Sequence, residues 1–68
     1  MTKAEIIDII TNSVKSQEMC RIFFKYYYNY SYHFPLKTSD KLFLSADEDD
    51  FILNGFSIRR FCDIRKVE

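Results

Sequence analysis

The chain has 68 residues and a mass of 8.2 kDa, which predicts one small domain over residues 1–68. From the surface scaling of globular proteins, about 60% of the unfolded chain's surface is buried on folding. Apolar residues make up 47%, with a single Gly and a single Pro, which excludes disorder, collagen-like repeats and Gly/Ser linkers. Ten basic and ten acidic side chains cancel, which argues against a duplex DNA binder but leaves local basic patches open.

The first residues carry no targeting signal. Residues 1–5 are largely polar, and Asp8, Thr11 and Asn12 interrupt the apolar residues that follow, so a signal-peptide hydrophobic region is absent. No run of apolar residues approaches the roughly 20 that span a bilayer. We therefore expect a cytoplasmic protein without membrane association.

Two cysteines, Cys20 and Cys62, are too few for a disulfide framework and have no metal-ligand spacing. We expect both to be reduced thiols in the core. A redox or metal role is the alternative, and it would need further ligands, of which His33 is the single histidine. The sequence therefore predicts no metal site and no cofactor.

A helix is predicted over residues 2–15. Thr2 followed three residues later by Glu5 has the pattern of a capping box. Behind it, apolar residues recur at helical spacing, namely Ile6, Ile7, Ile10 and Val14, and Ile9 widens this stripe. The helix is therefore amphipathic and must lie on another element.

Alternation predicts a first strand over residues 20–28. We take as its core face the alternate residues Cys20, Ile22, Phe24, Tyr26 and Tyr28. Asn29 is the expected turn before a second strand, over residues 30–37, in which two sets alternate: Tyr30, Tyr32, Phe34 and Leu36 against Ser31, His33, Pro35 and Lys37. Pro35 has no amide hydrogen, which places this strand at an edge or marks a bulge.

After a turn at residues 38–40, a third strand is predicted over residues 41–46, with Leu42 and Leu44 opposite Phe43. Residues 47–50 are four acids, which we place at an exposed hairpin tip, and they lack the ligand spacing of a calcium loop. A short buried strand follows at residues 51–53. Asn54-Gly55 then predicts a type I′ hairpin turn leading into a strand over residues 56–61, a 3₁₀ turn around Asp63 and a last short strand.

These elements predict the α+β class, with a helix over residues 2–15 and an antiparallel meander over residues 19–67. A five-stranded sheet so small and so aromatic is expected to curl strongly, toward an SH3-like or Sm-like partial barrel. The chain ends on Glu68 without a polar tail, which fits either a short native protein or a fragment cut near a domain boundary.

A family resemblance rests on the order of these elements, on Pro35, and on residues 41–46 and 56–68. Over residues 14–68 the chain resembles an Sm-like or SH3-like small barrel, and more narrowly the WYL domain of bacterial regulators and short Firmicute proteins with a similar ending. The tripeptide that names the WYL family is here Leu42-Phe43-Leu44 or residues 41–43. Because that family is thought to sense nucleic acids or nucleotides, the resemblance implies ligand contacts by Phe43, Arg59 and Arg60.

Eight of the twelve residues 23–34 are aromatic, more than one core face needs. The surplus could be covered by the rest of the sheet, by a partner subunit, or by unpaired bases stacked beside Arg21, Lys25 and Lys37. For the partner subunit we expect the contacts to be Phe23, Tyr27, Tyr30 and Tyr32.

A second cluster is basic: Arg59, Arg60, Arg65 and Lys66. Arg59 and Arg60 must point to opposite sides of a strand, which leaves either a solvated face or a phosphate or carboxylate site. Catalysis finds little support, since His33 is expected to be an ordinary strand residue and a chain of this size is expected to lack a well-formed pocket of several hundred Å³.

The sequence therefore favours a non-enzymatic interaction module that associates with itself or with another protein through the aromatic hairpin and an exposed sheet edge. The alternative is a regulatory module of WYL or Sm-like type that binds a nucleic acid or a nucleotide.

Overall fold

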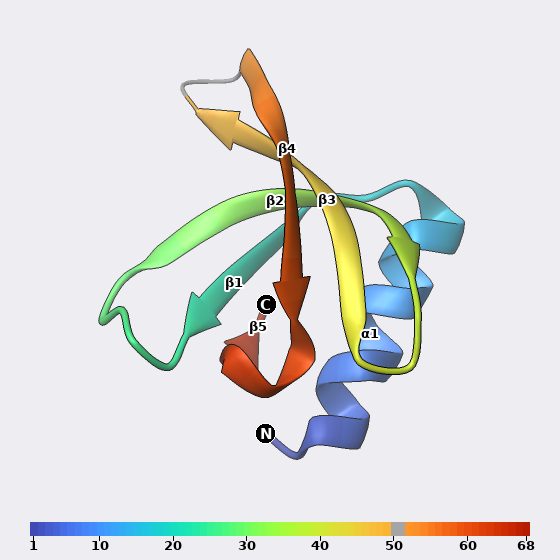
Figure 1. Cartoon of the computed structure of the whole chain (residues 1–68), viewed down its shortest axis with the longest axis vertical. Helices are drawn as coiled ribbons and strands as arrows, with labels where there is room; N and C mark the ends of the chain where they lie inside the picture. The colour runs from blue at the N-terminus through green and yellow to red at the C-terminus, as the bar shows by residue number, and fades with distance from the viewer. Residues whose placement is uncertain (50–51) are drawn as a thin grey trace.

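One helix and a five-stranded antiparallel sheet make up the computed structural model, which describes residues 1–49 and 52–68 (Figure 1). In chain order, the elements are α1 (Lys3–Ser16), β1 (Cys20–Phe24), β2 (Tyr30–Thr38), β3 (Leu42–Asp49), β4 (Ile52–Arg60), the 3₁₀ turn η1 (Phe61–Asp63) and β5 (Ile64–Val67). The strand order is β4-β3-β2-β1-β5, so β4 and β5 are the two edges. The predicted α+β class is confirmed.

The predicted helix and its capping box are both present. Thr2 Oγ accepts from the Glu5 amide at 3.2 Å, and the Glu5 carboxylate accepts from the Thr2 amide at 3.0 Å, which lowers the pKa of Glu5. The helix ends at Gln17, whose left-handed backbone lets its amide bond the Ser13 carbonyl. Within the described residues, no helix is long and apolar enough to cross a bilayer.

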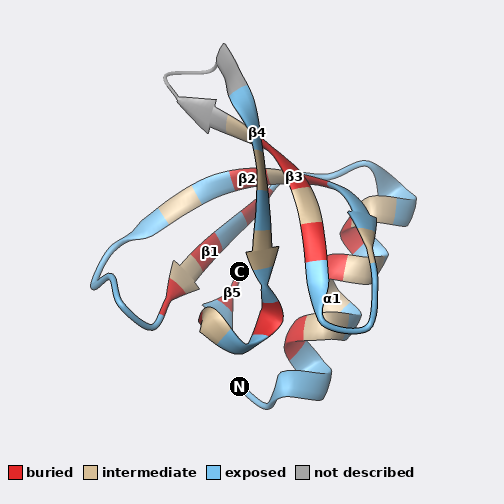
Figure 2. Cartoon of the chain, in the orientation of Figure 1, coloured by how far each residue is buried: buried red, intermediate tan, exposed pale blue. Residues whose placement is uncertain are grey.

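The core lies between α1 and one face of the sheet (Figure 2). Its members are Ile6, Ile10, Cys20, Ile22, Phe24, Phe43, Phe61, Ile64 and Val67. The Cys20 thiol donates to Ser13 Oγ at 3.0 Å across the helix–sheet contact, and burial raises the pKa of that thiol. The predicted core face of β1 is therefore confirmed for Cys20, Ile22 and Phe24.

The same prediction is wrong for Tyr26 and Tyr28, which are exposed. The strand ends at Phe24 because the chain turns there, with the Tyr27 amide bonded to the Phe24 carbonyl at 3.2 Å. The Lys25 amide bonds instead to the Asp63 carbonyl at 2.7 Å. Alternation no longer applies beyond that turn, so the three tyrosines at residues 26–28 lie outside the core.

Asn54-Gly55 does not form the predicted hairpin turn, since both residues lie inside β4. Ala46 pairs with Phe56 and Glu48 with Leu53, so two residues of β4 lie opposite Asp47. This is a β-bulge, and Gly55 supplies its positive φ of 99°. The separate strand predicted over residues 51–53 is therefore wrong, because Ile52 already begins β4; residue 51 lies outside the described residues.

The acidic run leads into the β3–β4 hairpin, but the prediction of an exposed tip is wrong for Asp47, the first of the four acids. Residues 47–49 belong to β3 and Asp47 is half-buried, whereas residue 50 lies outside the described residues. Pro35 marks a bulge, as predicted, through a register shift between Pro35 and Lys37. The alternative of an edge strand is wrong, since β2 has β1 and β3 on either side.

The 3₁₀ turn and the last strand appear where the sequence predicted them. Within η1, Phe61 turns into the core while Cys62 faces solvent. The prediction that Cys62 is a core thiol is therefore wrong, because the strand alternation on which it rested ends at Arg60.

Replacing Phe24 with Ala should lower the free energy of unfolding by about 3 to 5 kcal/mol, because it removes a buried ring and leaves a cavity. Urea denaturation followed by circular dichroism measures this change. Tyr28→Ala, which truncates a ring that is 91% exposed, is the control and should change stability by less than about 0.5 kcal/mol. A Phe24→Ala loss below about 1 kcal/mol would show that the core has been assigned to the wrong face.

Candidate interaction surface

The sheet carries a basic and aromatic surface on the side opposite the core. In β1, Arg21 and Phe23 alternate with the buried residues, and the register pairs Arg21 with Tyr32 and Phe23 with Tyr30. On the other side of β1, Phe23 pairs with Lys66 of β5. We call this surface the aromatic-basic face and define it by Arg21, Phe23, Tyr30, Tyr32, Arg65 and Lys66.

Three rings on this face contact one another edge to face. The Phe23 and Tyr30 centroids are 5.6 Å apart at an interplanar angle of 61°, and those of Tyr30 and Tyr32 are 5.3 Å apart at 81°. Such T-shaped pairs are the arrangement that the ring quadrupoles favour. Three of the four predicted interface residues are therefore brought together.

Each of two rings has a cation placed over it. Arg65 and Lys66 lie 5.1 Å and 5.4 Å from the Phe23 centroid, and Arg21 lies 5.3 Å from that of Tyr30. Glu68 holds two of these cations, Lys66 at 3.0 Å and Arg21 at 2.7 Å, and its hydrogen bond from Lys66 lowers the pKa of the Glu68 carboxyl. The basic groups are thus positioned by ion pairs as well as by the rings.

Tyr27, the fourth predicted interface residue, lies apart in the turn after β1. Its ring stacks on that of Tyr28 with centroids 6.0 Å apart, and both side chains are exposed. The turn is tied to β5 by Arg65, whose Nη2 donates to the Tyr28 carbonyl at 3.1 Å. Tyr27 therefore borders the aromatic-basic face without joining its ring contacts.

The three ligand contacts implied by the family resemblance do not share a groove. Phe43 is 1% exposed and stacks on Phe61 in the core. Arg59 lies 5.1 Å from the Phe24 centroid and donates to the Tyr26 hydroxyl. Arg60, on the opposite side of β4, donates two hydrogen bonds of 2.9 Å to Asp63.

His33 belongs to a polar cluster that the sequence reasoning missed. Its Nδ1 lies 2.9 Å from Asp47 Oδ1, and its Nε2 lies 2.7 Å from Ser31 Oγ. Ser57 and Ser45 also donate to Asp47 Oδ1, at 2.9 Å and 3.2 Å. The available signal was the serines at positions 31, 45 and 57, which occupy strand positions on the same side as His33.

Serine, histidine and carboxylate follow one another here in the order used for nucleophilic catalysis. The His33 ring is 3% exposed, however, and both its nitrogens are bonded within the chain. A general base must reach the proton that it removes from a substrate. We therefore interpret this cluster as one that positions strands β2, β3 and β4.

Stability should depend on pH through His33. Burial lowers the pKa of His33, and this effect outweighs the opposing effect of Asp47. Below about pH 6.5, the ordinary histidine pKa, the unfolded chain therefore binds a proton that the folded chain does not. The free energy of unfolding should fall as the pH drops below that value and stop responding to His33 once the folded protein also takes up the proton.

Urea denaturation between pH 7.5 and pH 5 measures this dependence, with His33→Gln as the comparison. The variant should be less stable at pH 7.5. Just below pH 6.5, its free energy of unfolding should also fall less steeply with decreasing pH than that of the wild type. An identical slope in both proteins would rule out His33 as its source.

Comparisons of the chain with protein-family models, with curated proteins and with solved structures found no match in any of the three.

Proposed function

We propose that this chain is a non-enzymatic binding module that associates with a second copy of itself or with another protein through the aromatic-basic face. The observation that carries the proposal is the edge-to-face contact of three rings, those of Phe23, Tyr30 and Tyr32. Of these residues, Tyr30 and Tyr32 remain 37% and 40% exposed. Aromatic residues and arginine dominate the energy of protein interfaces. Rings already held in place lose little conformational entropy on binding.

The edges of the sheet support association as well. Strand β5, which carries Arg65 and Lys66 of the aromatic-basic face, is an edge strand, and on its outer side the Val67 amide donates to Met1 Sδ at 3.3 Å. On the other edge, Phe56 and Ile58 of β4 are 73% and 70% exposed. An open edge presents unpaired backbone groups that can pair with a strand of another chain.

A partial barrel of SH3-like or Sm-like type is the finer fold that we propose with this function. It is supported by Arg59 of β4, which lies over Phe24 of β1 although β2 and β3 separate the two strands. The 3₁₀ turn between β4 and β5 further supports it, since it carries the chain from one edge of the sheet to the other.

A second candidate is a module that binds single-stranded nucleic acid. It is favoured by three basic side chains, Arg21, Arg65 and Lys66, placed beside aromatic rings on one face. Bases stack on such rings while cations neutralise the phosphates. The cations already over Phe23 and Tyr30 would have to move for a base to stack there, so protein association ranks first.

The first proposal predicts that the wild-type chain is a dimer or larger species, or forms a complex with a partner, and that this holds at high salt. Tyr30→Ala and Tyr27→Ala should leave a folded monomer and raise the dissociation constant, by roughly tenfold for Tyr30. Light scattering at 0.1 M and 0.5 M salt measures the mass. Leu36→Ala is the control, because Leu36 is 39% exposed but lies outside the aromatic-basic face.

If Leu36→Ala weakens association as much as Tyr30→Ala does, the surface has been assigned wrongly. A wild-type chain that is monomeric at millimolar concentration, and that binds no protein partner through Tyr30, would contradict the proposal itself.

The second candidate predicts binding of a fluorescent single-stranded oligonucleotide that weakens steeply between 50 mM and 200 mM salt. Replacing Arg21 or Lys66 with Gln should reduce the slope of the logarithm of affinity against the logarithm of salt concentration by about one. Fluorescence anisotropy measures both quantities. An affinity that does not depend on salt concentration, or that is the same in both variants as in the wild type, would rule this candidate out.

A further inference from the structure

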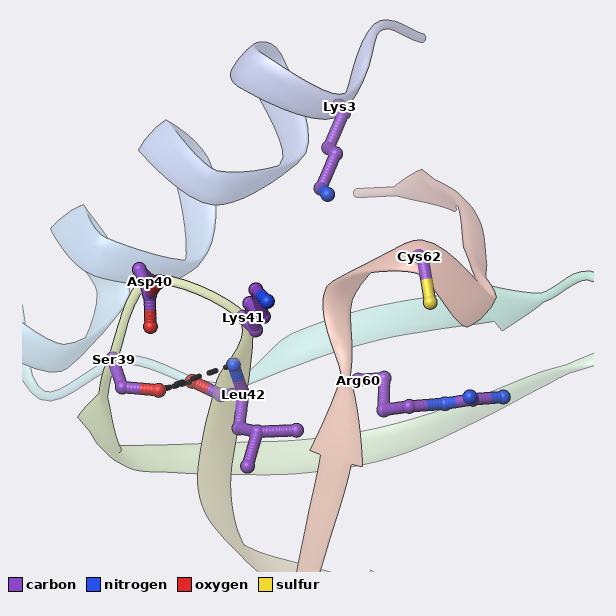
Figure 3. Close-up of a pocket in the computed structure, with 7 residues that line it drawn as sticks. All are labelled: Lys3, Ser39, Asp40, Lys41, Leu42, Arg60 and Cys62. Carbon is purple, nitrogen blue, oxygen red and sulfur yellow. Dashed lines mark hydrogen bonds between the residues drawn. The ribbon is translucent and has the colours of Figure 1, made fainter.

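A cavity of about 400 Å³ opens where the start of α1, the turn between β2 and β3, and η1 come together (Figure 3). It shares no residue with the aromatic-basic face, and its lining consists of Lys3, Ser39, Asp40, Lys41, Leu42, Arg60 and Cys62. All seven lining residues are exposed, so this is a hollow of the surface and not an enclosed pocket. Three chain segments meet here, and the short side chains of Ser39, Asp40 and Cys62 do not fill the space between them.

The cavity is rich in positive charge. Three of its lining residues are basic and one is acidic, which leaves a net charge of +2. Figure 3 shows the Lys3 side chain extending from the helix toward the space beside η1, with Lys41 at the end of the turn, and both residues line the cavity. In the part of the chain that the structure describes, neither ammonium forms an ion pair. Two unpaired cations facing one hollow repel each other unless an anion lies between them.

Arg60 does not supply a third free cation. Its guanidinium donates two hydrogen bonds to Asp63, so it contributes mainly its aliphatic stem to the cavity wall. A second hollow of about 240 Å³ adjoins the first, shares Lys3 and Cys62 with it, and adds the ammonium of Lys25. The cations of the main cavity that form no ion pair among the described residues are therefore Lys3 and Lys41, and Lys25 lines the adjoining hollow.

The walls of the cavity are preformed and partly apolar. In the turn, the Ser39 amide donates to the Leu42 carbonyl at 2.8 Å, and the Leu42 amide donates to Ser39 Oγ at 3.2 Å. Leu42 places a half-exposed apolar side chain against the cavity, next to the stem of Arg60. A site of this composition suits a molecule that has a charged group at one end and an apolar body at the other.

We propose that this cavity binds a small organic phosphate, with the phosphate between Lys3 and Lys41 and the apolar body against Leu42 and the Arg60 stem. Two unpaired ammonium groups match a phosphate monoester, which carries a charge near −2 and three terminal oxygens. A carboxylate carries one charge and leaves one ammonium unmatched. The volume is at the lower end of the range for small-molecule sites, which limits the body to about the size of one aromatic ring.

Titration with phenyl phosphate, followed by NMR of the folded protein, tests the proposal. The resonances of Leu42 and Cys62 should shift, and phenyl phosphate should bind roughly tenfold more tightly than benzoate, inorganic phosphate or benzyl alcohol. If benzoate binds as tightly, the requirement for a dianion is wrong. A dissociation constant of about 10 mM is the weakest binding that we would count as a site. If no resonance of the cavity shifts at about 10 mM phenyl phosphate, the proposal that this cavity binds an organic phosphate is wrong.

Two variants and a matched control locate the binding groups. Lys3→Gln and Lys41→Gln should each weaken phenyl phosphate binding about tenfold, the loss expected for one charge-assisted hydrogen bond. Lys15→Gln removes the same charge from the other end of α1 and should leave binding unchanged. An equal loss in all three variants would mean that the anion responds only to net charge, which overturns the proposal. Tyr30→Ala should not affect binding, so this test is independent of the proposed association.

Discussion

One carboxylate oxygen, Asp47 Oδ1, receives hydrogen bonds from three adjacent strands: from His33 of β2, Ser45 of β3 and Ser57 of β4. Asp47 is half-buried, and the loss of these donors would destabilise the fold, so these bonds favour one register of the strands. Because strand side chains alternate with a period of two, a slip by one residue would exchange the two faces of β2. By holding His33 inside, the cluster keeps Tyr30 and Tyr32 outside, on the aromatic-basic face.

Much of the fold follows from local patterns. Capping at Thr2 and alternation over Cys20, Ile22 and Phe24 predicted the helix and the core face of β1, and the same alternation places Phe23 and Tyr30 on the outer surface. The failures occur where long-range pairing overrides a local signal. Gly55 has the positive φ expected of a hairpin turn, but it lies in β4, in a bulge opposite Asp47 of β3. No short-range pattern distinguishes a glycine in a turn from a glycine in a bulge.

The two proposed sites differ in how far the sequence could predict them. Alternation and the register of β1 with β2 are enough to assemble Arg21, Phe23, Tyr30 and Tyr32 of the aromatic-basic face. Alternation would place the consecutive residues Arg65 and Lys66 on opposite sides of β5, yet both lie over Phe23 next to the register shift between β1 and β5. The cavity at Lys3 and Lys41 requires knowledge of how a helix start and a turn meet, which depends on the whole fold. Overall neutrality also hides it, because equal numbers of acids and bases do not place an acid beside every base: among the described residues, no ion pair includes Lys3 or Lys41.

Strand β1 lies between β2 and β5, although some forty residues separate it from β5 in the chain. Arg21 and Glu68 exchange two backbone hydrogen bonds, of 3.1 Å and 2.9 Å, and Ile64 and Val67 complete the core. During synthesis on the ribosome, β1 therefore has one open side until residue 68 has left the exit tunnel. In that interval the edge of β1 that later pairs with β5 presents unpaired backbone groups, and the core lacks Ile64 and Val67.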